Sequence, residues 1–276
     1  MTRVLALCAD DYGAARGIDD AIVKLAAAGR LSAVSCLANG EHWSGAAPAL
    51  RRVAGRVDVG LHFNLSEGRP LSAELARAWA SLPALPRLIA LAHLGALPLQ
   101  AIRAELACQL EVFTAAAGMA PRFVDGHQHV HHLPGVRGIV LEAVERMRPM
   151  PAVRNTGRVL GPGWRIKRLL IGATGGRALL HQLARRGIAH NPALSGVYDF
   201  EATDYRALMQ RWLAAIPAEG ALLFCHPGAG STAADVDPIA AARVREWNYL
   251  RSAGFTDDLA AADVTLGPVW RTEATR

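Results

Sequence analysis

Two adjacent carboxylates near the start of the chain are residues that could do chemistry. Asp10 and Asp11 follow directly on an apolar run, residues 4–8, that is typical of a fully buried strand. A buried charge costs free energy unless it is paired, so acids at the end of such a strand indicate a metal ion, a proton or a partner cation. One acid could bind a metal while its neighbour, pointing the other way, acts as a base. The alternative is a helix N-cap followed by a first-turn acid.

Imidazoles follow three further strand-like runs. His62 lies near the end of residues 57–65, His226 follows residues 220–225, and a His-rich segment, residues 125–132, follows a short run in mid-chain. The C-terminal ends of parallel strands lie along one edge of a sheet, where α/β folds place their sites. We therefore expect the acids and imidazoles to meet there. Asp plus two His, with water in the remaining positions, suits catalytic Zn²⁺ or a similar divalent ion such as Mg²⁺, Mn²⁺ or Co²⁺.

The His-rich segment contains more imidazoles than one metal ion needs. Alternation along a continued strand would place His127, His129 and His131 on one side, although residues 133–135 (Leu-Pro-Gly) turn the chain soon afterwards. We expect at least two of its four histidines to support the site or to lie at the surface. Asp125, just before them, is expected to hydrogen-bond a metal-binding imidazole.

Strand-like and helix-like segments alternate along most of the chain. This order is typical of right-handed βαβ units and a mainly parallel sheet. About seven strands predict an α/β fold, a distorted (β/α) barrel rather than a regular eightfold one, as a single domain over residues 1–276. The predicted strands are residues 4–9, 33–38, 57–65, 122–125, 152–154, 220–225 and 264–266. The predicted helices are residues 18–28, 42–53, 99–117, 135–148, 163–186 (interrupted by glycines), 204–215 and 238–252, with short helices and loops over residues 71–99.

Composition excludes several classes of protein. The chain has 276 residues, 51% of them apolar, and a net charge of +6 that is almost entirely arginine. Without an aromatic-interleaved basic patch, no nucleic-acid partner is predicted. The basic residues over 165–186 are expected to be a solvated helix side, with a membrane-surface role as the alternative. Homodimers are common for such folds, so a second copy of the chain is a candidate partner.

Cysteine usage and hydropathy indicate where the protein works. The four cysteines are widely spaced and form no CxxC pair, which predicts neither a disulfide framework nor a cysteine zinc site. The acids at positions 10 and 11 end the first apolar run too early for a signal peptide. No apolar run approaches the roughly 18 residues of a membrane span. We expect a cytoplasmic protein without a transmembrane segment.

Four motifs, taken in order and spacing, resemble the YdjC/ChbG family of metal-dependent carbohydrate deacetylases, which includes the hopanoid-associated HpnK branch. The similarity runs from about residue 3 to 255. The motifs are Ala9-Asp10-Asp11-Tyr12-Gly13, Gly60-Leu61-His62-Phe63-Asn64-Leu65 with Glu67-Gly68-Arg69-Pro70-Leu71, Asp125-Gly126-His127-Gln128-His129-Val130-His131, and Cys225-His226-Pro227-Gly228. Tyr12, Phe63 and Gly126 stand where the family usually has Phe, Leu and Ser, and none of these departures removes an expected metal ligand.

The resemblance implies hydrolysis of an N-acetyl group on an amino sugar, such as a chitooligosaccharide, with a divalent ion (Mg²⁺ or Zn²⁺). It implies that Asp11, His62 and His127 hold this metal. Asp10 would be the general base that activates water, and His226 the acid or the oxyanion-stabilising group.

The resemblance also implies a supporting set around these residues. Arg154 would orient the base, and its alternative is a surface arginine. Asp125, His129 and Asn64 are expected to support the ligands or to contact the sugar.

Three other functions stay open. An amidohydrolase-type barrel would use His127 and His129 as its metal pair, although such a pair normally ends the first strand. A cysteine enzyme would use Cys225 beside His226, but neighbours on a strand point to opposite faces. A metal-stabilised sugar-binding protein without turnover is the third.

Overall fold

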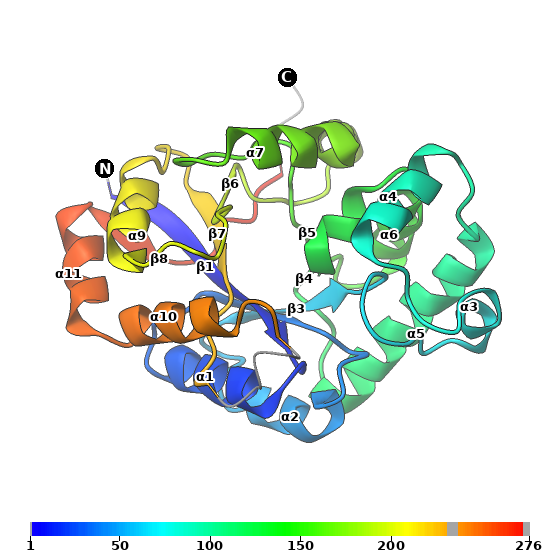
Figure 1. Ribbon diagram of the computed structural model, residues 1–276, viewed down its shortest axis with the longest axis horizontal. Coiled ribbons are helices and arrows are strands. Elements are labelled where there is room, and N and C mark those ends of the chain that lie inside the picture. The colour runs from blue at the N-terminus through cyan, green and yellow to red at the C-terminus, as the bar shows by residue number, and fades with distance from the viewer. Residues whose placement is uncertain (1, 231–236, 273–276) are drawn as a thin grey trace.

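A curled, parallel sheet forms the centre of the computed structural model, which describes residues 2–230 and 237–272 (Figure 1). Its strand order is β5-β4-β3-β2-β1-β7-β6, and β8 pairs with the first residues of β1. Every pair of named strands is parallel. The strands are β1 (Arg3–Tyr12), β2 (Ala33–Cys36), β3 (Asp58–Phe63), β4 (Phe123–Gly126), β5 (Ala152–Val153), β6 (Leu194–Ser195), β7 (Ala221–Cys225) and β8 (Val264–Leu266). The predicted distorted (β/α) barrel is confirmed, as a half-barrel with seven strands on the main path.

Strand β1 lies at the middle of the sheet and pairs with β2, β7 and β8. Its residues from Leu5 onward are all buried. This explains the unbroken apolar run, because a parallel strand covered on both faces has no solvent side that would select polar residues.

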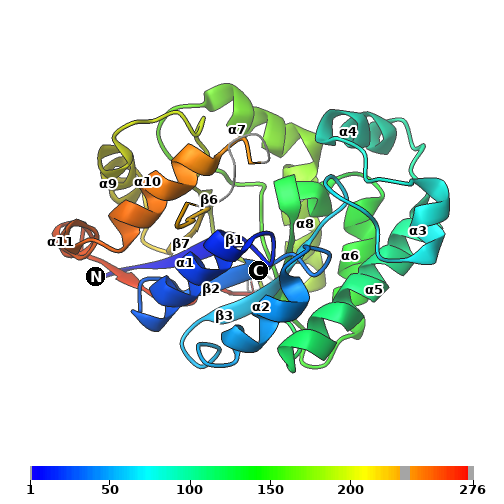
Figure 2. The ribbon, with the colours of Figure 1, turned by 60° about the horizontal axis from the view of Figure 1, so that its bottom comes forward.

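Helices surround the sheet in groups that follow the chain. Figures 1 and 2 show α9, α10 and α11 at one end of the molecule and α3 to α6 at the other, with α1 and α2 between them. The helices are α1 (Arg16–Ala27), α2 (Trp43–Leu50), α3 (Ala73–Ala78), α4 (Leu85–His93), α5 (Leu99–Ala117), α6 (Val136–Arg146), α7 (Arg165–Ile171), α8 (Arg177–Arg186), α9 (Tyr205–Ala214), α10 (Ala240–Leu250) and α11 (Ala253–Ala261). The predicted helix over residues 99–117 is confirmed, and it ends where Gly118 adopts a left-handed conformation.

The interruption by glycines that was predicted within residues 163–186 is confirmed: two helices, α7 and α8, are joined by a π turn, Gly172–Gly176, in which Gly175 has a φ of 151°. Two other elements differ from the prediction. The last predicted helix begins at position 240, and a separate α11 follows it. Strand β6 was not predicted, since two residues are too short to show a period.

The four cysteine thiols are free, and those of Cys8, Cys36 and Cys225 are buried. Among the described residues, no helix is long and apolar enough to cross a membrane.

Strands β3 and β4 approach closely at Gly60, two residues before His62. A Cβ at position 60 would lie 2.5 Å from the ring of Phe123 on β4. That ring is itself fixed by stacking on Trp270, with 4.9 Å between centroids. Glycine is therefore required at position 60, because a larger residue would push β3 away from β4 two residues before His62.

We expect Gly60→Ala to lower the free energy of unfolding by about 1–3 kcal/mol, because the buried Phe123 ring must shift to admit a methyl group. The control is Gly138→Ala in α6, where a Cβ meets nothing within 4 Å. That change should raise stability by about 0.5 kcal/mol through helix propensity. Urea denaturation of both variants measures the difference, and equal effects would contradict the close-approach argument.

Candidate active site and metal centre

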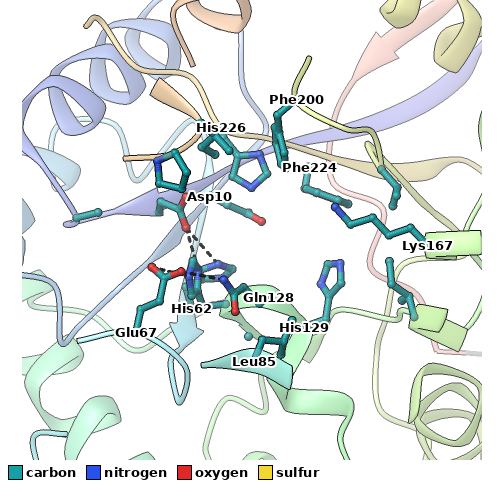
Figure 3. Close-up of a pocket in the computed structure, with 18 of the residues that line it drawn as sticks. Asp10, His62, Glu67, Leu85, Gln128, His129, Lys167, Phe200, Phe224 and His226 are labelled. Carbon is teal, nitrogen blue, oxygen red and sulfur yellow. Dashed lines mark hydrogen bonds and ion pairs between the residues drawn. The ribbon is translucent and has the colours of Figure 1, made fainter. Parts of the chain in front are cut away.

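A cavity of about 520 Å³ opens at the C-terminal ends of the central strands. Acid and imidazole side chains reach it from β1, β3, β7 and the segment after β4, as predicted. Figure 3 shows His62, Glu67 and His226 among the polar residues around it, with Lys167 lying across the cavity from Glu67.

Both acids of β1 line this one cavity, although neighbours on a strand normally point to opposite faces. The strand extends through them to Tyr12, and its register with β2 shifts between Ala9 and Tyr12. Asp11 has a φ of 68°, a left-handed conformation that is uncommon outside glycine. This irregularity re-aims the chain so that Asp10 and Asp11 both reach the cavity.

Asp11, His62 and His127 form a compact cluster of metal-binding side chains. Asp11 Oδ1 lies 3.1 Å from His127 Nδ1 and 3.6 Å from His62 Nε2. Ligand atoms bound to one ion at roughly 2.0–2.2 Å are separated by roughly 3–4 Å, so these distances fit a common ion. One carboxylate and two imidazoles are also a donor set that Zn²⁺ and related divalent ions accept.

The far nitrogen of His62 is fixed by buried partners. Its Nδ1 lies 2.6 Å from Asp125 Oδ1 and 3.0 Å from Ser35 Oγ, and the Ser35 hydroxyl also donates to Asp125. A carboxylate behind a metal-binding histidine selects the tautomer that leaves the other nitrogen available. Asp125 thus occupies the place expected of it, while Ser35 was not predicted.

Asp10 is held by a buried arginine. Arg154, fully inaccessible to solvent, donates from Nη1 and Nη2 to the two carboxylate oxygens of Asp10, at 2.7 Å each. Its Nη2 also lies 2.5 Å from Asp125 Oδ2. Although burial opposes its charge, Asp10 and Asp125 raise the pKa of Arg154 well above its usual value. The interpretation of Arg154 as a surface residue is wrong.

A second arginine, which was not predicted, pairs with Asp11. Arg243 on α10 donates from Nη2 to Asp11 Oδ2 at 2.8 Å and from Nε to Asp237 at 2.6 Å. Burial alone would raise the pKa of Asp11, but Arg243 and the hydrogen bond with His127 hold it well below its usual value. Arg243 therefore binds Oδ2 of Asp11, while Oδ1 faces His62 and His127.

His127 is charged in the protein without metal. Burial opposes protonation, but hydrogen bonds with Asp11 and Glu67 raise the pKa of His127 to about 10. Its Nε2 lies 3.2 Å from Glu67 Oε2. The motif that resembles the family contains Glu67, which was nevertheless not predicted to be functional.

His226 lies on the wall of the cavity beside Phe200 and Phe224. Burial lowers the pKa of His226 to about 4, so the imidazole is neutral at neutral pH. Its backbone N–H donates to Glu246 Oε2 at 2.5 Å, and the Tyr198 hydroxyl donates to the same carboxyl group. Glu246 and Arg243 were not predicted. They lie three positions apart on α10, on the side that the helix buries. Two opposite charges at this spacing among apolar positions are the sequence feature that could have identified them.

The remaining histidines have separate places. After β4 the chain forms a 3-10 turn, His127–His132, in which Gln128 and His129 have left-handed φ values. His129 lines the cavity, and burial lowers its pKa well below the usual value. His131 contacts the carbonyl of Arg154, and His132 lies between the hydroxyls of Thr156 and Thr174. The continued strand is therefore not found; His131 lies outside the cavity lining, whereas His132 lines the cavity together with His129.

Asn64 shapes the loop after β3 and does not line the cavity. Its side-chain oxygen accepts the backbone N–H groups of Ser66 and Glu67, and its amide donates to the carbonyl of Glu67. Asn64 thereby fixes the turn that presents Glu67 to His127.

The chain matches the model of one protein family and is similar in sequence to curated deacetylases of two names. The model of the family described as YdjC-like protein matches residues 4–261. A carbohydrate deacetylase of Mus musculus is 40% identical over 167 residues, 55% of this chain and 52% of its own length. A chitooligosaccharide deacetylase of Enterobacter sp. (strain 638) is 33% identical over 153 residues, 53% of this chain and 57% of its own. The chain thus matches about half the length of these curated relatives.

The fold is shared with a solved structure. A protein of Enterococcus faecalis V583, provisionally named for cellobiose-phosphate cleavage, aligns over 96% of this chain and 97% of its own. The TM-score is 0.75 and the sequence identity 17%. The architecture is therefore that of a known fold.

Glu246 gives stability a specific pH dependence. Burial raises the pKa of this carboxyl from 4.5 to about 7, although Tyr198 and the His226 N–H oppose the shift. The folded protein therefore binds the proton more tightly than the unfolded chain, and this stabilisation is complete below about pH 4.5 and lost as the pH rises through about 7. We expect Glu246→Gln to remove about 3 kcal/mol of that pH-dependent change.

The free energy of unfolding, measured with chelator between pH 5 and 8, tests this. Glu41→Gln, at an exposed position, is the control for a general change of charge. A wild-type decline that persists unchanged in Glu246→Gln would contradict the assignment.

Proposed function

Because the chain belongs to the YdjC-like protein family, we propose that it is a metal-dependent hydrolase that removes the N-acetyl group from an amino sugar, such as a unit of a chitooligosaccharide. The observation that supports this most is that Asp11, His62 and His127 lie together in the same cavity as the arginine-bound Asp10. Linear amide hydrolysis needs an activated water, a polarised carbonyl and a proton for the leaving amine, and these groups can supply all three. The names of the curated relatives support the substrate class.

The metal ligands we propose are Asp11, His62 and His127, with Mg²⁺ or Zn²⁺ as the ion. When bound, such an ion polarises a carbonyl and lowers the pKa of water toward ~7. Asp125 fixes His62 from behind, and Arg243 fixes Asp11. Metal binding must displace the proton of His127, so the affinity for metal should rise with pH.

Asp10 is the proposed general base. Arg154 engages both of its oxygens and so fixes the plane of the carboxylate, but each oxygen retains a lone pair that can accept a proton from water. The role of Arg154 is to position the base.

His226 is proposed to act on the carbonyl oxygen or the leaving nitrogen. A neutral imidazole, which burial favours here, can donate its N–H to a developing oxyanion without first binding a proton. His129, farther along the cavity, is proposed to contact the sugar.

The alternative metal pair of His127 and His129 is less well supported. Among the described residues, the clusters able to hold one ion include His127 with Asp11 and His62 but do not include His129. A sugar-binding protein without turnover would use the same cavity, and an assay separates it from an enzyme.

Acetate release from N,N′-diacetylchitobiose tests the proposal. The protein is stripped with chelator, assayed, and refilled with Zn²⁺, Mg²⁺ or Co²⁺. We expect release only after refilling. Tight binding of the disaccharide with no release under any ion would favour the binding protein without turnover.

Asn substitutions at the two adjacent acids should have different effects. Asp10→Asn should bind metal about as tightly as the wild type but lose turnover by roughly 10²–10⁴-fold, because it lacks the base. Asp11→Asn should lose metal affinity first, with activity partly restored by excess metal. Metal titration calorimetry and kcat together make the distinction, and normal turnover in Asp10→Asn would overturn the role given to it.

A further inference from the structure

Helix α7 carries the densest group of exposed apolar side chains among the described residues. Trp164, Ile166, Leu169 and Leu170 lie within seven positions and are 48%, 75%, 58% and 56% exposed. Ile166, Leu169 and Leu170 have i, i+3, i+4 spacing, so they form one stripe on the helix, with Trp164 at its start. We call this set the α7 stripe.

The segment of the chain that contains the α7 stripe has basic residues but no acidic ones. Residues 146–198 contain ten Arg or Lys and no Asp or Glu. Within residues 2–230 and 237–272, Arg165, Arg168 and Arg177 have no carboxylate within ion-pair distance. Of the ten, three do pair: Arg154 inside the site, Arg158 with Glu219, and Arg186 with Glu145. Asp199 interacts with Trp164 and Lys167, and the charges of Arg165, Arg168 and Arg177 are left without an ion-pair partner in the part of the chain that the structure describes.

The α7 stripe is continuous with the mouth of the cavity. Leu170 is both exposed and part of the cavity wall, where it is joined by Ile171 and Lys167. Figures 1 and 2 both place α7 and α4 along the same side of the molecule, and Leu85 and Ile89 of α4 line the same cavity. Whatever covers the stripe lies at the entrance of the site.

We propose that the α7 stripe docks the protein on an anionic lipid bilayer, with its entrance facing the surface. A short helix with Trp, Ile and Leu on one side and Arg and Lys beside them is suited to the interface between headgroups and acyl chains. Basic residues next to it are attracted to anionic headgroups.

The charge around the α7 stripe favours an anionic lipid surface over a second copy of the chain as its partner. A twofold contact through the α7 stripe would bring Arg165, Arg168 and Arg177 of one copy against the same residues of the other. Asp199 interacts with Trp164 and Lys167, but Arg165, Arg168 and Arg177 have no ion-pair partner among the described residues that would neutralise them. An anionic lipid surface supplies both the apolar and the negative partner.

Vesicle co-sedimentation of the full chain tests the proposal. The probes are phosphatidylcholine vesicles and phosphatidylcholine vesicles with about 30% phosphatidylglycerol. We expect binding to the anionic vesicles only, weakened at least tenfold by the double variant Ile166→Ser/Leu169→Ser and by Arg165→Glu, and weakened by high salt. The matched control is Leu94→Ser, because Leu94 is 79% exposed but lies at the end of α4 outside the basic region.

Two outcomes would overturn the proposal. One is no vesicle binding, or equal loss in Leu94→Ser and the double variant. The other is a wild-type dimer by light scattering that Ile166→Ser/Leu169→Ser converts to a monomer, without lipid binding. The proposal does not rest on the reaction: Ile166 and Leu169 do not line the cavity, so acetate release from soluble chitobiose should be unchanged in the double variant.

Discussion

The buried guanidinium of Arg154 is the interaction on which the site depends. It joins Asp10 of β1 to Asp125 of β4, two carboxylates from strands that are not neighbours in the sheet. Burying a carboxylate without a partner cation is costly, and removing one member of a buried ion pair typically costs about 3–5 kcal/mol. Because Asp125 also fixes His62, one arginine positions Asp10, the proposed base, and, through Asp125, His62, a proposed metal ligand. The two side chains are thus held in fixed relative positions.

The balance of charge explains why the cluster suits a cation. The carboxylates around the cluster outnumber the guanidinium groups of Arg154 and Arg243; they are those of Asp10, Asp11, Asp125, Asp237 and Glu67. Negative charge is therefore left over, and in the protein without metal the proton on His127 offsets part of it. A divalent ion in the cluster would supply positive charge in place of that proton. The proton and the metal therefore compete for His127, which ties the affinity for the ion to pH.

The sequence predicted the fold and most of the site because both follow from strand ends. Apolar runs followed by acids or imidazoles identify a parallel strand and its functional edge together, which is how Asp10, Asp11, His62, His127 and His226 were found. Arg243 and Glu246 were missed because they come from a helix, and their relation to the cavity depends on how α10 packs. The bulge at Asp11 and the left-handed turn at Gln128 and His129 were missed as well. Their cause is tertiary: ordinary residues occupy strained backbone positions only where their surroundings impose it.

Strand ends contribute one kind of side chain to the lining of the cavity, and helices and loops contribute another. Strand ends provide Asp10, Asp11 and His62, whose positions the sheet fixes through backbone hydrogen bonds and buried ion pairs. Helices α4 and α7 and the loop around Phe200 provide an apolar wall that includes Leu85, Ile89, Leu170 and Phe200. No hydrogen-bond network joins these four side chains to the acids, since an apolar side chain has no donor or acceptor. Substitutions in this wall can therefore change which molecule the cavity binds while the acids and histidines stay in place.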